Sequence, residues 1–185
     1  MISDKDRSGY IGASDTAAVM RSWDTKTFAR WWRVKQGLET QDFASEAMMA
    51  GSAYEHRILD ALGIPGLEKD RQIIKGRLRV NLDGNTQEKI YEVKTYRAGK
   101  PFRAPLAYRQ QVNVEMYASG IYSACIVAYA LEEADYRNFY REVDAARLTF
   151  HEIPYDGEFI KKYEKRLLYL GECLEKGIFP QEGAV

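Results

Sequence analysis

Glu92 and Lys94 are separated by one residue in the strand-like segment QEKIYEVKTY, so their opposite charges lie on one face of an extended chain. Asp83 ends the preceding alternating segment, LRVNLD, on its polar face. If the two segments pair as a hairpin, two carboxylates meet, and they require a cation between them or a proton on one of them. Oxygen ligands without a nearby histidine or cysteine favour Mg²⁺ or Mn²⁺ over zinc. On the local pattern alone, a salt bridge at a sheet edge is the favoured interpretation of Glu92 and Lys94.

Two expected helices carry further polar groups in unusual places. Glu55 falls on the apolar face of a helix expected over residues 46–62, where an unpaired carboxylate would cost several kcal/mol, so a metal ion or an arginine partner is equally expected there. Gln111 and Glu115 share a face of a helix that follows Pro105, and an exposed polar face would explain them as well. His56 lies about 100° round the helix from Glu55 and is expected outside any metal site.

The order of these residues along the chain resembles the PD-(D/E)xK nuclease superfamily. The single Glu-x-Lys of the sequence is weak evidence, but its flanking segments are more specific. Four of them together are similar to the lambda-exonuclease/YqaJ family, in the same order and over residues 7–176: RSGYIGASDTAAVM (7–20), AGSAYEHRILDALG (50–63), LDG…YEVKT (82–95) and AYRQQVNVEMYASG (107–120). One departure is Leu82, where the family often has proline before the motif aspartate.

The resemblance implies an α/β fold with a central mixed β-sheet flanked by helices. It also implies a Mg²⁺-dependent exonuclease, with Mn²⁺ as a substitute, that degrades one strand of linear double-stranded DNA from its 5′ end and supplies single strands for phage-type recombination. By matching positions, the implied metal ligands are Asp83, Glu92, the Val93 carbonyl and Glu55. Lys94 would position and help to deprotonate the attacking water, and Gln111 would lie beside this centre.

The same resemblance implies a site for the terminal 5′-phosphate at Arg7 and Ser14. Ser14 has a second expected role as the N-cap of a short helix over residues 15–20. The basic residues of the next helix fit either contacts with the DNA backbone or a solvated helix face; they are Lys26, Arg30, Arg33 and Lys35.

Two alternative functions remain open from the sequence. A structure-specific or restriction-type endonuclease can use the same metal centre, because the metal ligands do not determine whether a DNA end is required. A non-catalytic DNA-end-binding protein is the alternative from a different class, although the complete set of acidic residues and lysine argues against it. By family analogy alone, we expect a single-strand annealing protein as a partner and a ring-shaped homotrimer.

The expected elements alternate between helices and strands, with no internal repeat or linker, which predicts a single domain over residues 1–185. Helices are expected over residues 25–36, 46–62 and 105–119 and over a long segment that includes residues 159–174, with Gly120 ending the third. Strands are expected over residues 78–83 and 89–95, joined by a turn at Gly84 and Asn85, and over residues 122–130, 137–142 and 147–153.

Composition excludes several classes of protein. The 27 basic and 27 acidic residues balance, so net charge gives no sign of a nucleic-acid or membrane partner. The two cysteines are too few for an iron–sulfur or zinc site and fit free thiols in a reducing compartment. No apolar stretch is long enough to span a bilayer, so we expect a cytoplasmic protein. The family resemblance implies a bacterial, phage or prophage origin.

Overall fold

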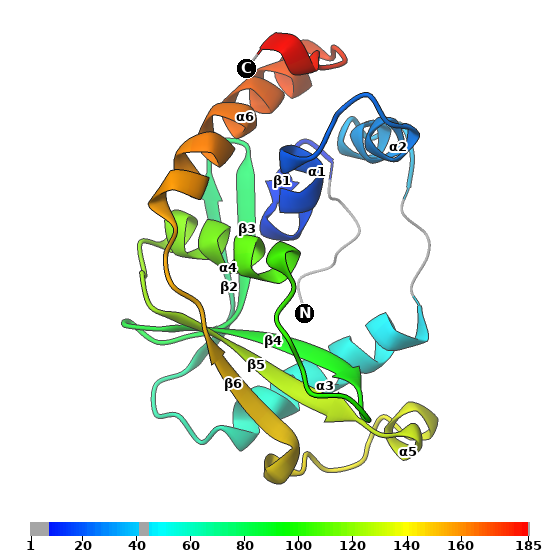
Figure 1. Cartoon of the computed structure of the whole chain (residues 1–185), viewed down its shortest axis with the longest axis vertical. Coiled ribbons are helices and arrows are strands. Elements are labelled where there is room, and N and C mark those ends of the chain that lie inside the picture. The colour runs from blue at the N-terminus through cyan, green and yellow to red at the C-terminus, as the bar shows by residue number, and fades with distance from the viewer. Residues whose placement is uncertain (1–7, 41–44, 185) are drawn as a thin grey trace.

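The computed structural model describes residues 8–40 and 45–184 and has a mixed β-sheet with helices on both faces (Figure 1). This confirms the expected fold class. The strands are β1 (Ile11–Gly12), β2 (Glu68–Lys75), β3 (Leu78–Asn85), β4 (Ile90–Arg97), β5 (Ala124–Leu131) and β6 (Leu148–Glu152). The helices are α1 (Thr16–Met20), α2 (Lys26–Lys35), α3 (Glu46–Ala61), α4 (Leu106–Ser119), α5 (Glu133–Arg137) and α6 (Gly157–Lys176), with short 3₁₀ turns at Ala13–Asp15, Ala145–Arg147 and Glu182–Ala184.

Strand β3 has three neighbours, and this determines the shape of the sheet. It pairs along its length with β2 in antiparallel fashion. On its other side it pairs with β1 only at Leu78 and Arg79, and with β4 only at Gly84 and Asn85. On its other edge β4 pairs in parallel with β5 along its whole length, and β5 pairs antiparallel with β6. Among the described strands, residues 80–83 of β3 therefore have no ladder partner on the side of β4, and the two strands diverge there as a fork.

Two separate apolar cores cover the two faces of β4 and β5. Ile90, Ile126 and Ala128 point to the larger core, which is completed by α1, α2, α4 and α6. Val93, Val127 and Tyr129 point to the smaller core under α3 and α5. Figure 1 shows α4 and α6 on one side of the sheet and α3 on the other. The strict period of two along β4 is thus what sends Glu92 and Lys94 toward α4 and Val93 toward α3.

Local signals explain where the long helices begin and end. Ser45 and Asp156 cap the first turns of α3 and α6 by accepting hydrogen bonds from Met48 and Phe159. Gly120 ends α4 in the left-handed conformation, as predicted. Gly84 at the fork has a different role, because an added Cβ would lie 2.8 Å from the Leu59 side chain. A side chain at Gly84 would force the Leu59 side chain of α3 to move.

Asp15 holds the turn after β1 against α2. One of its carboxylate oxygens accepts from the Gly12 backbone N–H and pairs with Lys35, and the other accepts from the Trp31 indole. Lys35 is only 3% exposed and pairs with Asp15, so it differs from both expectations for this helix, which assumed an exposed side chain. Asp15 rather than Ser14 is the residue before α1, and Ser14 is an exposed member of the preceding 3₁₀ turn, so the predicted N-cap role of Ser14 is wrong.

Most of the predicted elements are confirmed, and three differ. Residues 137–142 do not form a strand: a capping box at Glu132 and Asp135 starts a short helix that ends at Arg137, and residues 138–142 form a turn and loop. Gly84 and Asn85 are the last residues of β3 rather than a turn. Strand β2 was not predicted, because its sequence EKDRQIIK is highly charged and only one side of it pairs in the sheet.

Two expectations from composition also have structural counterparts. Cys125 and Cys173 are buried free thiols, as expected. Within the described part of the chain, no helix combines the length and the apolar character needed to cross a membrane.

The Asp15 contacts predict a specific loss of stability. Asp15→Ala should lower the free energy of unfolding by about 3–5 kcal/mol, because Lys35 would be left charged and buried without its partner. Urea denaturation measures the change. Ser14→Ala, one residue away and exposed, is the matched control and should stay within about 0.5 kcal/mol of wild type. Equal stabilities for the two variants would contradict a structural role for Asp15.

Candidate active site

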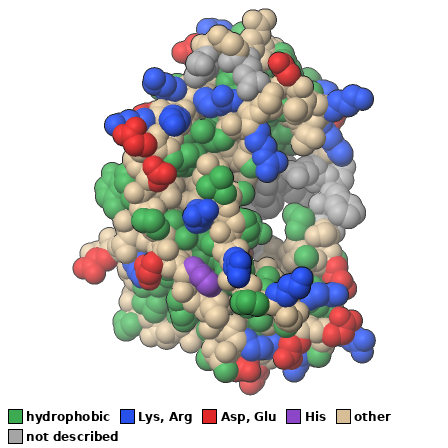
Figure 2. All heavy atoms as spheres, in the orientation of Figure 1, with side chains coloured by type: hydrophobic (Ala, Val, Ile, Leu, Met, Phe, Trp, Pro, Cys, Tyr) green, Lys and Arg blue, Asp and Glu red, His purple; other side chains and the backbone are tan. Residues whose placement is uncertain are grey.

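The fork between β3 and β4 opens into a pocket of about 920 Å³. Its walls come from the turn after β1, from β3 and β4, from α3 and from α4. Figure 2 shows the molecule hollowed between the part that carries α1 and α2 and the part that carries α3, with Lys and Arg side chains on both sides of the hollow. The fork is therefore the place where both layers of the fold reach one cavity.

At the fork, the Asp83 side chain replaces a backbone hydrogen bond that β3 and β4 no longer form. The Val93 N–H donates to Asp83 Oδ2 at 2.8 Å instead of to a β3 carbonyl. Since the N–H and C=O of one strand residue point to the same side, the Val93 carbonyl also faces the fork rather than β5. The backbone of Val93 and the carboxylate of Asp83 are thus brought together by the divergence of the two strands.

Glu92 and Lys94 meet α4 on the other side of the strand. Lys94 Nζ lies 2.8 Å from Glu92 Oε1, which also accepts a 2.6 Å hydrogen bond from Gln111 Nε2. The same Gln111 nitrogen donates to Glu115 Oε1 at 2.9 Å, while Gln111 Oε1 accepts from Lys94 at 3.3 Å. Because a lysine can only donate, these contacts fix the orientation of the Gln111 amide. Gln111 therefore holds Glu92, Lys94 and Glu115 in one network.

Negative charge exceeds positive charge at the base of the pocket. Glu92 and Glu115 are 2% and 0% exposed, and within the described residues each has one carboxylate oxygen, Oε2, that lacks a hydrogen-bond partner. Burial, followed by the charge of Glu92, raises the pKa of Glu115 well above its usual value. Asp83 shows the same effect, since burial and then the charges of Glu92 and Glu55 raise its pKa strongly.

Lys94 is the lysine that opposes this charge. Burial on its own would lower the pKa of Lys94, but attraction to Glu92 and Asp83 outweighs it, so the pKa is raised. The ammonium also lies 4.7 Å from the centre of the Tyr108 ring, a favourable contact for a cation. Lys94 is therefore held as a cation at neutral pH rather than as a neutral base.

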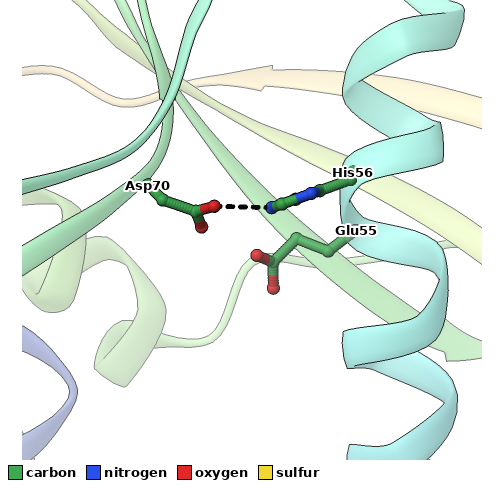
Figure 3. Close-up of side chains that lie close together, drawn as sticks. All are labelled: Glu55, His56 and Asp70. Carbon is green, nitrogen blue, oxygen red and sulfur yellow. Dashed lines mark ion pairs between the residues drawn. The ribbon is translucent and has the colours of Figure 1, made fainter. Parts of the chain in front are cut away.

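Helix α3 and strand β2 together carry a second group of metal-ligating side chains in the pocket (Figure 3). Glu55, His56 and Asp70 each offer a ligand atom, and these atoms lie within 4.8 Å of one another. His56 Nε2 pairs with Asp70 Oδ2 at 2.9 Å, and the Glu55 carboxylate points toward the space beside them. Burial, followed by the charge of Glu92, raises the pKa of Glu55. The Glu55 carboxylate therefore interacts electrostatically with the base of the pocket.

The structure brings together nearly all of the residues selected from the sequence. Asp83, Glu92, Val93, Lys94, Gln111, Glu55 and Ser14 all line this pocket. Arg7 lies outside the described residues. Their assignment as metal ligands, catalytic groups and phosphate contacts stays a prediction.

Three acidic or histidine residues of the pocket were given no site role from the sequence: Glu115, His56 and Asp70. Glu115 was detectable from its place one turn after Gln111 on the same helix face. Asp70 was not, because β2 itself was not predicted. His56 turns into the same pocket as Glu55 despite its different angle on the helix, so the 100° separation did not exclude it.

The residues at the base of the pocket fit a divalent cation of the Mg²⁺ class. The donors are carboxylate oxygens and a backbone carbonyl, which such ions prefer. Two buried carboxylate oxygens lack partners among the described residues, and several carboxylates repel one another there. A bound cation would relieve both costs.

Comparison with solved structures identifies the fold. The chain superposes on an alkaline exonuclease, LHK-Exo, from Laribacter hongkongensis with a TM-score of 0.69 and 19% identity, over 92% of this chain and 90% of that one. A second LHK-Exo structure, in complex with dAMP, gives a TM-score of 0.68, again with 19% identity and the same coverage. A phage-related exonuclease from Haemophilus somnus 129PT gives 0.63 and 14% identity, over 90% and 94% of the two chains. The fold is that of known exonucleases.

This likeness agrees with the resemblance to the lambda-exonuclease/YqaJ family that the four sequence segments indicated. At these levels of identity it establishes the shared architecture, not the activity. No protein-family profile matches the sequence, and no curated protein does.

The raised pKa of Asp83 predicts how stability depends on pH. In the unfolded chain Asp83 ionises near its ordinary pKa, about 3.9, but in the folded protein it resists ionisation to higher pH. The metal-free protein should therefore lose stability as pH rises through the interval between these two values, and Asp83→Asn should remove this part of the loss.

Thermal unfolding in EDTA tests this prediction. Asp83→Asn should unfold at a higher temperature than wild type at pH 8, and the difference should shrink toward pH 4. The exposed Asp24→Asn is the control and should follow wild type at every pH. A variant that is less stable than wild type at pH 8 would show that Asp83 is not a strained carboxylate.

Proposed function

We propose that this protein is a divalent-cation-dependent deoxyribonuclease that removes nucleotides from the 5′ ends of linear double-stranded DNA. The observation that carries the proposal is the group of carboxylates around Lys94, with two buried oxygens that lack hydrogen-bond partners among the described residues. A bound cation would stabilise such a site, whereas an ordinary salt-bridge network already pairs its charged groups. The fold shared with exonucleases supports the choice of reaction.

The proposed roles follow from the chemistry of phosphodiester hydrolysis. A bound Mg²⁺ or Mn²⁺ would activate a water molecule and neutralise charge that develops on the phosphate. Asp83 and Glu92 would hold the cation together with the Val93 carbonyl and Glu55. Gln111 keeps Glu92 in place by a hydrogen bond to its Oε1, which leaves the unpartnered Oε2 for the cation.

Lys94 would act as a fixed positive charge. It lies two residues beyond Glu92 on the same face of β4, roughly 7 Å further along the strand. Its ammonium pairs with Glu92 Oε1 and would lie beside the attacking water and the scissile phosphate. Its raised pKa keeps it protonated, so it would lower the pKa of the water by its charge and would not accept the proton itself.

The preference for a 5′ end rests on the resemblance and on the position of Ser14. Ser14 is exposed and lines the pocket on the wall that follows β1, across from α3. Its hydroxyl would contact the terminal phosphate together with Arg7. The dAMP found in one of the similar exonuclease structures is the kind of product that stepwise digestion of DNA releases. We further propose a single-strand annealing protein as a partner and a homotrimeric ring as the assembly, both by family analogy.

Variants of the base of the pocket test the reaction. Asp83→Ala and Glu92→Ala should abolish Mg²⁺-dependent degradation of linear duplex DNA. Lys94→Ala should slow it on the order of 10²-fold, equivalent to ~3 kcal/mol of transition-state stabilisation, with unchanged DNA affinity in Ca²⁺. Lys176→Ala, at the exposed end of α6, is the matched lysine control. Near-normal digestion by either acidic variant would place the reaction elsewhere, and equal losses of affinity and rate for Lys94→Ala would make it a DNA-binding residue.

A pair of substrates tests the requirement for an end. The wild type should digest 5′-phosphorylated linear duplex much faster than 5′-hydroxyl duplex, because a terminal phosphate carries nearly two negative charges and an internal phosphodiester carries one. Arg7→Ala and Ser14→Ala should each reduce that difference. Ser52→Ala, a hydroxyl on the α3 wall of the same pocket, should preserve it. All rates are compared at one salt concentration. Rapid cutting of closed circular DNA, or equal rates on both substrates, would favour an endonuclease.

A further inference from the structure

Tyr108 is an aromatic residue beside the candidate site to which the proposed reaction gives no role. It lies in the first turn of α4, where its backbone N–H donates to the Pro105 carbonyl at 3.1 Å. The side chain is partly buried and packs against the larger core. The centre of its ring is 4.7 Å from Lys94 Nζ, yet Tyr108 is not one of the residues that line the pocket. Tyr108 would therefore contact Lys94 rather than a substrate.

The ring of Tyr108 makes this contact, and its hydroxyl does not. Among the described residues, the hydroxyl has no hydrogen-bond partner. The face of an aromatic ring carries partial negative charge and attracts an ammonium group. Gln111 follows three positions later, on the same face of α4, and its Oε1 accepts from Lys94 at 3.3 Å. Helix α4 thus presents two neutral groups, a ring face and an amide oxygen, to one ammonium.

These neutral contacts matter because the charged partner of Lys94 has another role in the proposed reaction. Lys94 Nζ lies 2.8 Å from Glu92 Oε1. When Glu92 is shared with a divalent cation, its attraction for Lys94 is weakened, and the two positive charges repel each other. The attraction of a neutral ring is not lost in this way. A carboxylate in place of the ring would also attract the ammonium, but it would repel a DNA phosphate.

We propose that Tyr108 is a positioning residue for Lys94, and that the face of its ring holds the ammonium beside Gln111 when Glu92 binds a cation. The effect of Tyr108 on cleavage rests on the proposed function, but the contact between ring and ammonium does not. The proposal requires the ring and not the hydroxyl. Tyr108→Phe, which keeps the ring, and Tyr108→Leu, which keeps only apolar bulk, therefore form the informative pair of variants.

Nuclear magnetic resonance of the full chain with ¹³C-labelled lysine tests the contact without a nuclease assay. Hydrogens above the face of an aromatic ring are shielded, so the ε-methylene signal of Lys94 should be shifted upfield, both without metal and in Ca²⁺. Tyr108→Phe should keep this shift, and Tyr108→Leu should remove it. Lys75 is the internal control, because its ammonium lies 3.7 Å from the ring centre of Tyr117 on the same helix, and it should keep its shift in both variants. The Lys94 signal is the one that Lys94→Ala lacks.

Kinetics on linear duplex DNA test the positioning role. Tyr108→Leu should lower kcat on the order of 10-fold, the size expected for a desolvated cation–π contact, with DNA affinity in Ca²⁺ unchanged. Tyr108→Phe should keep the wild-type kcat. In a Lys94→Ala background, Tyr108→Leu should have no further effect, because a residue that acts through Lys94 then has nothing to position. A merely structural residue would lower kcat equally in both backgrounds.

Tyr117→Leu is the matched control for the loss of a ring from α4. Tyr117 and its partner Lys75 do not line the pocket, so the variant should keep the wild-type kcat. Thermal unfolding of each variant confirms that the protein assayed is folded.

Failure of this inference is distinguishable from failure of the proposed function. An unshifted Lys94 signal in the wild type, or a loss of kcat in Tyr108→Leu that is equally large in the Lys94→Ala background, would overturn the positioning role and leave the nuclease proposal intact. A shifted signal that depends on Tyr108, in a protein that does not degrade DNA, would reject the nuclease and leave the contact between ring and ammonium in place.

Discussion

The divergence of β4 from β3 after two residue pairs is the constraint on which the candidate site depends. Had the two strands remained paired, the Val93 N–H would bond to a β3 carbonyl and the space beside it would be filled by backbone. Instead Asp83 accepts that hydrogen bond, which fixes its carboxylate at the opening of the fork. The same opening lets Glu55 on one face of the sheet and Glu92 on the other reach a common cavity. Side chains from opposite faces of the sheet can meet at such an interruption.

Contacts elsewhere in the fold offset the electrostatic cost of burying the carboxylates of this site. Buried carboxylates with raised pKa values favour unfolding at neutral pH unless a cation binds. The pocket walls must therefore be held by groups that do not depend on the cation. Asp15 with Lys35 and Trp31 holds the wall after β1, and Leu59 packed against Gly84 holds α3 at the fork. The site is strained locally, while its supporting elements are anchored by ordinary buried interactions.

The sequence predicted the parts of the fold that carry strong periodic or capping signals. The helix α2, the helix α4 ended by Gly120 and the apolar strand β5 are examples, because burial on one or both faces leaves a clear pattern of residues. Strand β2 has no such pattern. It is a charged edge strand whose stability comes from pairing with β3, a long-range interaction that local sequence does not record. The fork was also beyond local reasoning, since a hairpin prediction assumes that two neighbouring strands stay paired.

The residues of the candidate site also divide into those with a local sequence signal and those whose position depends on long-range pairing. Asp83, Glu92 and Lys94 were recognisable because their spacing along two strands is local, and Glu55 because it interrupts an apolar helix face. His56 and Asp70 were not, because their proximity depends on where β2 passes α3. Asp70 lies opposite Asp83 in the β2–β3 pair, between the bonded pairs Lys69–Gly84 and Arg71–Leu82. Strand β2 thus brings a second aspartate next to the motif aspartate from the side that β4 does not occupy. A cavity with acidic residues on both sides of β3 has room for cation chemistry that the Asp and Glu-x-Lys motif alone does not describe.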